Sequence, residues 1–161
     1  MAKFAEGTEV SVAKSRAEIE RLIVRYGATH TAFMSAPGRA VICFEAKGRR
    51  IMFELPLPNE TDRKFTHVKL GRASYDTPRS PDAALAAWEQ ACRQRWRALA
   101  LVIKAKLEAV ESGITAFEDE FLAHIVMPDG QTVATHIKPR IADAYERGSM
   151  VPLLPPPSKL Q

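Results

Sequence analysis

The residues best suited to chemistry lie between Arg63 and Tyr75, where the chain reads RKFTHVKLGRASY. This stretch holds four cations, no acid and two interleaved aromatic rings: Arg63, Lys64, Phe65, Lys69, Arg72 and Tyr75. Cations neutralise phosphates and aromatic rings stack on unpaired bases, so the combination is typical of binding to single-stranded nucleic acid. Arg49 and Arg50, on the preceding hairpin, are predicted to extend this patch. The alternative is a solvated loop whose rings only pin it to the core.

Three further arginines, Arg93, Arg95 and Arg97, lie on a predicted helix and are candidates to enlarge the same patch. Glu89 precedes Arg93 by four residues, and Arg97 follows Arg93 by four. Such spacing is equally typical of a solvent-exposed helix face with intrahelical ion pairs. The helix arginines therefore leave both interpretations open.

A possible catalytic pair is Glu45 and Lys47, in the sequence Phe44-Glu45-Ala46-Lys47 at the end of a predicted strand. This pattern resembles the (D/E)-x-K half of the PD-(D/E)xK nuclease family. The resemblance implies that Glu45 helps to hold a divalent metal and that Lys47 positions the attacking water. The family also uses a second acid, usually an Asp, on the preceding strand or turn, and no Asp precedes Asp62 here. Too few oxygen ligands remain for efficient activation of water.

The remaining reactive side chains predict no metal site, no cofactor and no other catalytic group. The four histidines are dispersed and lack the spacing of metal ligands. The two cysteines, Cys43 and Cys92, fall on apolar faces and are predicted to be buried, reduced thiols.

The elements that must position these residues begin with a short strand at 8–12 and a helix capped by Ser15. Ser15 and Glu18 match a capping box, and Gly27 ends the helix. Three strands are predicted next, at 29–35, 39–46 and 49–55, with Pro37-Gly38 and Lys47-Gly48 between them. Connections this short join antiparallel neighbours, so the three strands form a meander.

A long helix, residues 81–112, is the strongest structural signal in the chain. Ser80 caps it, Pro81 suits its first position and Gly113 can end it. Its apolar stripe runs from Leu85 to Val110 with little drift, because several members recur every eleven residues. At about 48 Å the helix is longer than the strands it crosses, so part of the stripe needs another partner. Either the C-terminal segment or a second subunit would cover it, and self-association is predicted.

The rest of the chain is predicted to form a short helix from Thr115 to about residue 123, a hairpin near 125–133 and a final helix at 139–147. We expect one α+β domain over residues 1–148 and a proline-rich tail over 149–161. Within the domain, residues 59–80 form a basic loop that is either a binding arm or a passive connection.

Composition agrees with a globular protein of 161 residues and a formal net charge of +4. Residues 1–58 carry nine basic and six acidic side chains, whereas residues 113–161 carry four and six. This asymmetry favours an anionic partner that contacts the front of the chain. No uncharged apolar stretch approaches ~18 residues, so no membrane association is expected. The N-terminal residues lack an apolar core for export, and a cytoplasmic location is predicted.

Two resemblances concern larger parts of the chain. The sequences RQRWRALALVIKAKLEAVESGI and FEDEFLAHIVMPDGQTV resemble a family of small proteins from bacteria and their phages, which implies a role in phage or mobile-element DNA metabolism. A small antiparallel sheet crossed by a helix is similar, in architecture only, to single-strand annealing proteins.

Together these observations predict a non-enzymatic, oligomeric protein that binds nucleic acid, with single-stranded DNA as the expected form. One alternative is an oligomeric scaffold that binds other proteins. The other is a degenerate or divergent metal-dependent nuclease that uses Glu45 and Lys47.

Overall fold

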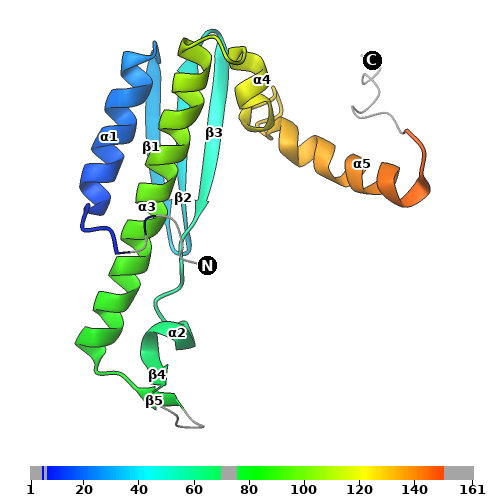
Figure 1. Ribbon diagram of the computed structural model, residues 1–161. Coiled ribbons are helices and arrows are strands. Elements are labelled where there is room, and N and C mark those ends of the chain that lie inside the picture. The colour runs from blue at the N-terminus through cyan, green and yellow to red at the C-terminus, as the bar shows by residue number, and fades with distance from the viewer. Residues whose placement is uncertain (1–4, 6, 70–75, 151–161) are drawn as a thin grey trace.

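A computed structural model describes residue 5, residues 7–69 and residues 76–150 (Figure 1). It shows a mixed α+β fold, as the sequence predicts. The elements, in chain order, are α1 (Val12–Arg25), β1 (His30–Ala36), β2 (Arg39–Ala46), β3 (Arg49–Pro56), α2 (Arg63–Thr66), β4 (His67–Lys69), β5 (Asp76–Pro78), α3 (Pro81–Glu111), α4 (Phe117–Phe121), the 3₁₀ turn η1 (Leu122–His124) and α5 (Val133–Arg147).

The predicted meander is confirmed, with β1, β2 and β3 paired antiparallel in that order. Both turns contain two residues. Lys47 and Gly48 have φ of 50° and 70°, which is the backbone of a type I′ turn and matches the right-handed twist of the strands. The turn geometry fixes the register, in which Ala46 opposes Arg49 and Phe44 opposes Ile51.

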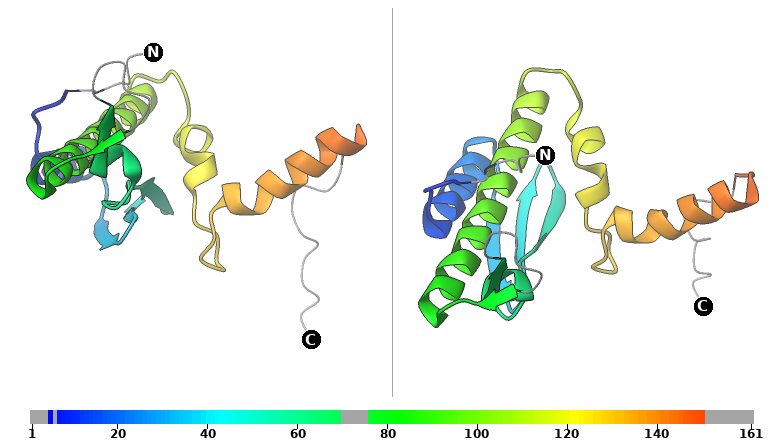
Figure 2. Two further views of the ribbon diagram at one scale, coloured as in Figure 1. Left: turned by 90° about the horizontal axis from the view of Figure 1, so that it is seen from below. Right: turned by 60° about the horizontal axis from the view of Figure 1, so that its bottom comes forward.

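The sheet buries only one of its two faces. Side chains that oppose one another across the strands point to the same face. The buried face carries Ala40, Ile42, Phe44, Ala46, Ile51, Phe53 and Leu55. Helices α1 and α3 both cover this face (Figures 1 and 2). The other face has no layer over it among the described residues, and we call it the open sheet face.

Helix α3 is the spine of the fold and begins as predicted, with the Ser80 hydroxyl accepting a bond from the Ala83 N–H (3.3 Å). Its buried residues are Cys92, Trp96, Leu99, Ala100, Ile103 and Leu107. The lower part of the helix extends past the sheet and packs against α2 (Figure 1). There Trp88 Nε1 donates to the Pro58 carbonyl (2.9 Å). The segment after β3 thus covers part of this end of the stripe, a contact that the sequence analysis did not predict, and Leu85 remains 42 % exposed. The C-terminal segment also packs against α3, through α4.

The C-terminal segment is anchored to the sheet by Phe121, which is fully buried. Ile125 forms an isolated antiparallel bridge with Ile51 on the edge strand β3. Helix α5 then leads away from the body (Figures 1 and 2), and Val133 is its only buried residue.

Several local predictions were wrong. Residues 8–11 form no strand, and α1 begins at Val12 because Ser11, not Ser15, caps it. Ser15 lies inside the helix and is buried. Helix α5 begins at Val133, where Thr132 provides the cap, and Pro139 lies inside it. The sequence analysis had placed the start of this helix at Pro139.

The predicted C-terminal hairpin is shorter in the structure. The predicted hairpin near 125–133 is reduced to an isolated bridge between Val126 and Thr132. Within the described residues, no helix has the length and apolar character that a bilayer crossing requires.

Candidate nucleic-acid interface

The predicted basic loop is folded, and two of its cations are paired with carboxylates. Arg63 Nε lies 3.2 Å from Asp76 Oδ2, and Lys64 Nζ lies 3.1 Å from Asp62 Oδ2. Lys69 is exposed at the end of β4. The loop therefore presents less free positive charge than its sequence suggests. Arg72 and Tyr75 lie outside the described residues.

Phe65 does not have the predicted role. Its ring is only 6 % exposed, and α2, which carries it, packs against α3. Lys64 Nζ sits 4.8 Å from the ring centroid. A base cannot stack on a ring that the protein already covers, so the prediction that Phe65 stacks on bases is wrong.

Arg49 and Arg50 do not extend the loop patch, because they lie at the opposite end of the sheet. Strand β3 separates them from the loop, and its eight residues span about 26 Å at 3.3 Å per residue. Both side chains are exposed. Arg50 lies on the open sheet face, beside a hollow of about 290 Å³ that Glu45 and His30 also line. The predicted patch is therefore divided into two distant groups.

Glu45 and Lys47 are also not brought together. Glu45 is on the open sheet face, where its Oε2 lies 3.8 Å from His30 Nδ1. Lys47 reaches toward α4 instead, with its Nζ 5.8 Å from the centroid of Phe117. Over residues 5, 7–69 and 76–150 no group of three His, Cys, Asp or Glu side chains could hold a metal ion. Glu45 thus has basic neighbours where a nuclease needs a second acid.

The structure brings together a different group of cations, on the outer side of the two long helices. We call it the basic helical surface, and it consists of Lys14, Arg21 and Arg25 of α1 and Arg93, Arg97 and Lys104 of α3. At about 100° per residue, each set of three falls within an arc of about 40° on its helix. The two arcs border the contact between the helices.

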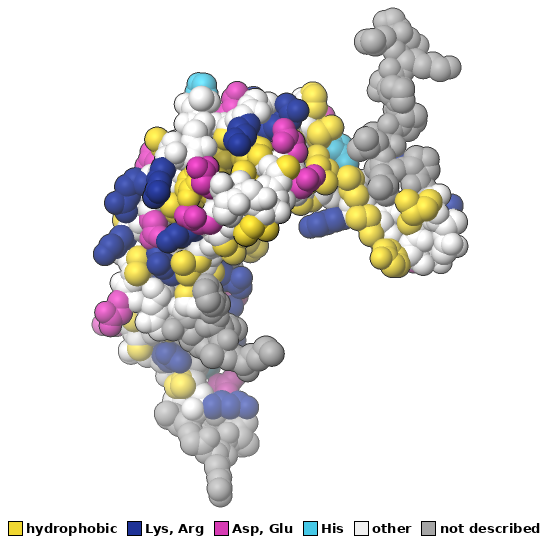
Figure 3. Space-filling view, turned by 45° about the horizontal axis from the view of Figure 1, so that its top comes forward, with side chains coloured by type: hydrophobic (Ala, Val, Ile, Leu, Met, Phe, Trp, Pro, Cys, Tyr) yellow, Lys and Arg dark blue, Asp and Glu magenta, His cyan; other side chains and the backbone are white. Residues whose placement is uncertain are grey.

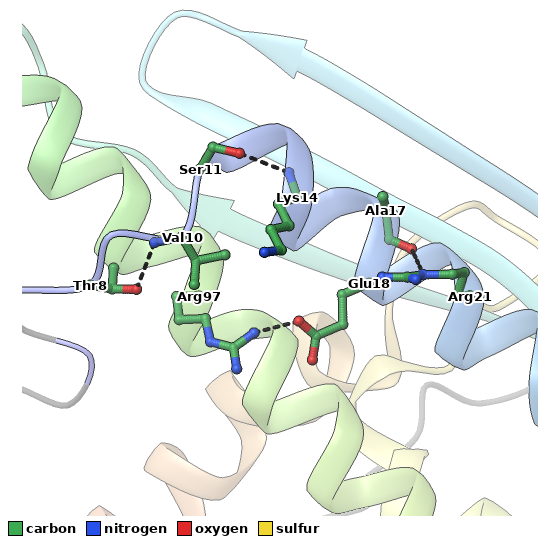
Figure 4. A network of polar contacts seen from close by, with 8 residues as sticks. All are labelled: Thr8, Val10, Ser11, Lys14, Ala17, Glu18, Arg21 and Arg97. Atoms are coloured by element: carbon green, nitrogen blue, oxygen red, sulfur yellow. Dashed lines mark hydrogen bonds and ion pairs between the residues drawn. The ribbon is translucent and has the colours of Figure 1, made fainter.

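Contacts at three levels show that α1 and α3 run parallel along this border. At the lower end Gln90 Nε2 donates to the Thr8 carbonyl (3.0 Å), and at the upper end the Tyr26 hydroxyl donates to Glu108 Oε1 (2.6 Å). Between them, Arg97 forms an ion pair with Glu18 (Figure 4). The two sets of cations are therefore held side by side by polar contacts between the helices.

Most of these cations are free of acidic partners. Arg97 is paired with Glu18, and Arg93 lies 3.8 Å from Glu89. The other four are Lys14, Arg21, Arg25 and Lys104, and within the described part of the chain no carboxylate pairs with any of them. Lys and Arg side chains accordingly gather on the flank over these helices, with acidic groups between them (Figure 3).

Two of the four free cations have their orientation set by neighbours on α1. Arg21 Nε donates to the Ala17 carbonyl (3.2 Å), as Figure 4 shows. The Arg25 guanidinium lies 5.7 Å from the centroid of Tyr26. Neither contact neutralises the guanidinium charge, so both groups remain able to bind an anion.

Glu108 explains why Lys104 is unpaired. The sequence spacing suggests an ion pair between them, four residues apart on one helix. In the structure Glu108 accepts a hydrogen bond from the Tyr26 hydroxyl instead, and this hydrogen bond raises the pKa of Tyr26. The Tyr26–Glu108 contact between the helices thus replaces the expected pair of Glu108 with Lys104 within α3. The positive charge of Lys104 stays exposed to solvent.

The sequence analysis left Arg93 and Arg97 open between a binding patch and a solvent face, and it did not single out the α1 cations. A signal was present, because Lys14, Arg21 and Arg25 follow the i, i+7, i+11 spacing of one helix face. What the sequence lacked was the relative placement of α1 and α3, which are more than fifty residues apart in the chain.

The two cysteines are free, as predicted, but only Cys92 is buried, whereas Cys43 is half-buried on the open sheet face, so that part of the prediction was wrong. Burial raises the pKa of Cys92, and it raises the pKa of Cys43 more than the nearby Arg50 lowers it. Both thiols are therefore protonated at neutral pH, which makes them poor nucleophiles.

Comparison with known proteins supplies no further assignment. No family model, curated protein or solved structure matches the chain.

Proposed function

We propose that this protein is a non-enzymatic nucleic-acid-binding protein and that the basic helical surface is its binding site. The observation that carries the proposal is the set of four cations without carboxylate partners, Lys14, Arg21, Arg25 and Lys104, on adjacent parallel helices. Phosphates attract such cations because their contact releases condensed counterions. The contacts hold the backbone of the strand and read no base.

Single-stranded DNA is the form that we propose. The three α1 cations extend over about 17 Å of helix axis, with Lys104 beside them on α3. A single strand can bend between the cations of the two helices, whereas a duplex is stiff over such a length. The function belongs, in this proposal, to phage or mobile-element DNA metabolism in the cytoplasm.

Fluorescence anisotropy with a labelled oligonucleotide tests the proposal. A variant with Lys14, Arg21, Arg25 and Lys104 all changed to Gln should bind at least tenfold more weakly at low salt, because four phosphate contacts are removed. A labelled duplex of equal length should bind the native protein more weakly than the single strand does. No binding of either nucleic acid by the native protein would refute the function.

A matched control removes four charges from the loop instead, at Arg63, Lys64, Lys69 and Arg72. This variant should retain nearly all the affinity, because Arg63 and Lys64 are already paired with carboxylates. If the loop variant loses binding and the helix variant retains it, the function stands but the assigned surface is wrong.

A second candidate function, favoured by one specific observation, is self-association as an interaction protein. Helix α5 carries apolar side chains that its own chain leaves exposed, Ile141 and Tyr145 among them. Light scattering at increasing concentration tests this candidate independently of DNA. A constant monomer mass would refute it.

A further inference from the structure

The open sheet face has an apolar centre. Its members come from all three strands and are Ala32, Met34, Val41, Cys43 and Met52. Met34 is 56 % exposed. Charged residues are confined to the two ends of this face, with Arg39 and Glu54 at one end and Glu45 and Arg50 at the other. An antiparallel sheet that faces water normally alternates apolar and polar residues, with the polar ones on the wet side. The centre of this face departs from that pattern.

Helix α5 presents the complementary feature, an apolar stripe without a partner. Ile137, Ile141, Ala144 and Tyr145 fall on one side of the helix. The stripe is partly covered near its start, but Ile141 is 43 % exposed, Tyr145 86 % and the following Met150 83 %. Hydrophobic side chains are visible on this projecting helix in Figure 3. A helix of 15 residues is marginal in water unless it buries such a stripe.

The two features do not meet within one chain. Helix α5 starts at the edge of β3, where the Val133 N–H binds the Ile125 carbonyl (2.9 Å), and from there it leads away from the sheet (Figures 1 and 2). We propose that two copies of this chain exchange arms, so that α5 of each copy packs its apolar stripe on the open sheet face of the other. This proposal rests on the self-association described above and specifies its surfaces.

The dimensions of the two surfaces agree. Helix α5, with 15 residues, is about 22 Å long and about 10 Å wide. The open sheet face is about 25 Å long, from strands of seven and eight residues, and about 14 Å wide across three strands. One helix therefore covers the apolar centre and leaves the charged ends in water.

The area also suits a stable dimer. Each helix-on-sheet contact has a footprint of about 220 Å² on either side, so exchange in both directions covers roughly 900 Å² in flat projection. Interdigitating side chains raise the accessible surface removed above this figure, to the about 1,000 Å² or more that a specific interface needs. Docking of two α5 helices on each other would bury a smaller area and leave both sheet faces exposed. The arm exchange is the arrangement that covers all four unpartnered surfaces.

Native Cys43, on the open sheet face, supplies a direct test. In the full-length chain, Cys92→Ser removes the buried thiol and Ala144→Cys places a thiol on the α5 stripe. At alkaline pH, where Cys43 forms the thiolate despite its raised pKa, a short bis-maleimide should then link Cys43 of one copy to the introduced cysteine of another. Mixing copies of normal and ¹⁵N-labelled protein identifies the link as intermolecular by mass spectrometry. A control with Glu146→Cys, on the opposite side of α5, should form this link at least tenfold less.

Light scattering separates the outcomes. The native chain should be dimeric, and Ile141→Asp with Tyr145→Asp should make it monomeric with an unchanged circular dichroism spectrum. A native chain that is monomeric at every concentration would refute self-association and arm exchange together. A dimer whose links join only the two introduced cysteines would refute arm exchange alone and indicate pairing of α5 with α5. Links from the Glu146→Cys control at equal yield would also refute the exchange.

Discussion

Phe121 joins the C-terminal segment to the sheet, and its removal should be one of the most destabilising single changes in the protein. Its ring lies edge-on to Phe44 and Phe53, with centroids 6.1 and 6.3 Å away, and 4.8 Å from Phe117. Truncation of a fully buried Phe to Ala costs about 3–5 kcal/mol, because transfer free energy is lost and a cavity remains. A domain of this kind has about 5–15 kcal/mol of stability in total, so Phe121→Ala should remove a large part of it.

Urea unfolding followed by circular dichroism measures this loss. The neighbouring Leu122, which is 50 % exposed, provides the matched control, and Leu122→Ala should cost less than about 1 kcal/mol. Equal m-values in the two variants would show that the comparison concerns stability alone. If Phe121→Ala costs no more than Leu122→Ala, the ring is not the anchor that its contacts indicate.

Three other predictions concern one histidine, one turn residue and one ion pair. His124 stacks on Phe53 at 4.0 Å, and burial together with Lys106 lowers its pKa, so the unfolded chain takes up a proton first as pH falls. Stability should therefore decline below about pH 6.5, by no more than about 1.4 kcal/mol per pH unit, and His124→Phe should reduce that slope in urea titrations at pH 5–8; an equal slope would contradict the assignment. Lys47→Asn should raise stability by a few tenths of a kcal/mol, because Asn adopts positive φ more readily in a type I′ turn, and an unchanged or lower melting temperature would count against that turn. A double-mutant cycle of Glu18→Gln and Arg97→Gln should give a coupling of about 1 kcal/mol for this partly buried pair, and a coupling near zero would show that it does not join the helices.

The sequence predicted the sheet and the long helix closely because their signals are local. The turns at Pro37-Gly38 and Lys47-Gly48 fix where β1, β2 and β3 begin and end, and the observed strands differ from the predicted ones by one residue at most. For α3, Ser80 and Pro81 mark the start, and the observed helix ends at Glu111. Caps and two-residue turns depend on neighbouring residues only.

Predictions failed where two local signals competed or where contacts between distant segments decide the outcome. Ser11 and Ser15 are both suitable caps for α1, and the additional turn that Ser11 allows brings Val12 against the core. The residues around Phe65 have the composition of a nucleic-acid-binding loop. The Phe65 ring is nevertheless buried, because α2 packs against the lower part of α3, which the sheet does not cover. Hydrophobic burial of a Phe side chain gains about 1.5–3 kcal/mol, which favours packing over exposure to solvent.

The candidate site depended most on information that the sequence lacks. The cations of α1 and α3 become one surface only after the helices pack in parallel, with Arg97 bound to Glu18 and Tyr26 bound to Glu108. The Tyr26 contact also prevents the intrahelical pairing that the spacing of Lys104 suggests. A charge count by region indicated a basic front half, which is correct but does not say which face carries it.

The salt dependence of single-stranded DNA binding tests the central claim most directly. Each phosphate contact to a single strand contributes about −0.7 to the slope of log K against log salt, so the four free cations predict a slope of about −3 and about 50-fold weaker binding at 200 mM than at 50 mM salt. The variant with Lys14, Arg21, Arg25 and Lys104 changed to Gln should have a slope near zero. An unchanged slope in that variant would contradict the assignment of the basic helical surface.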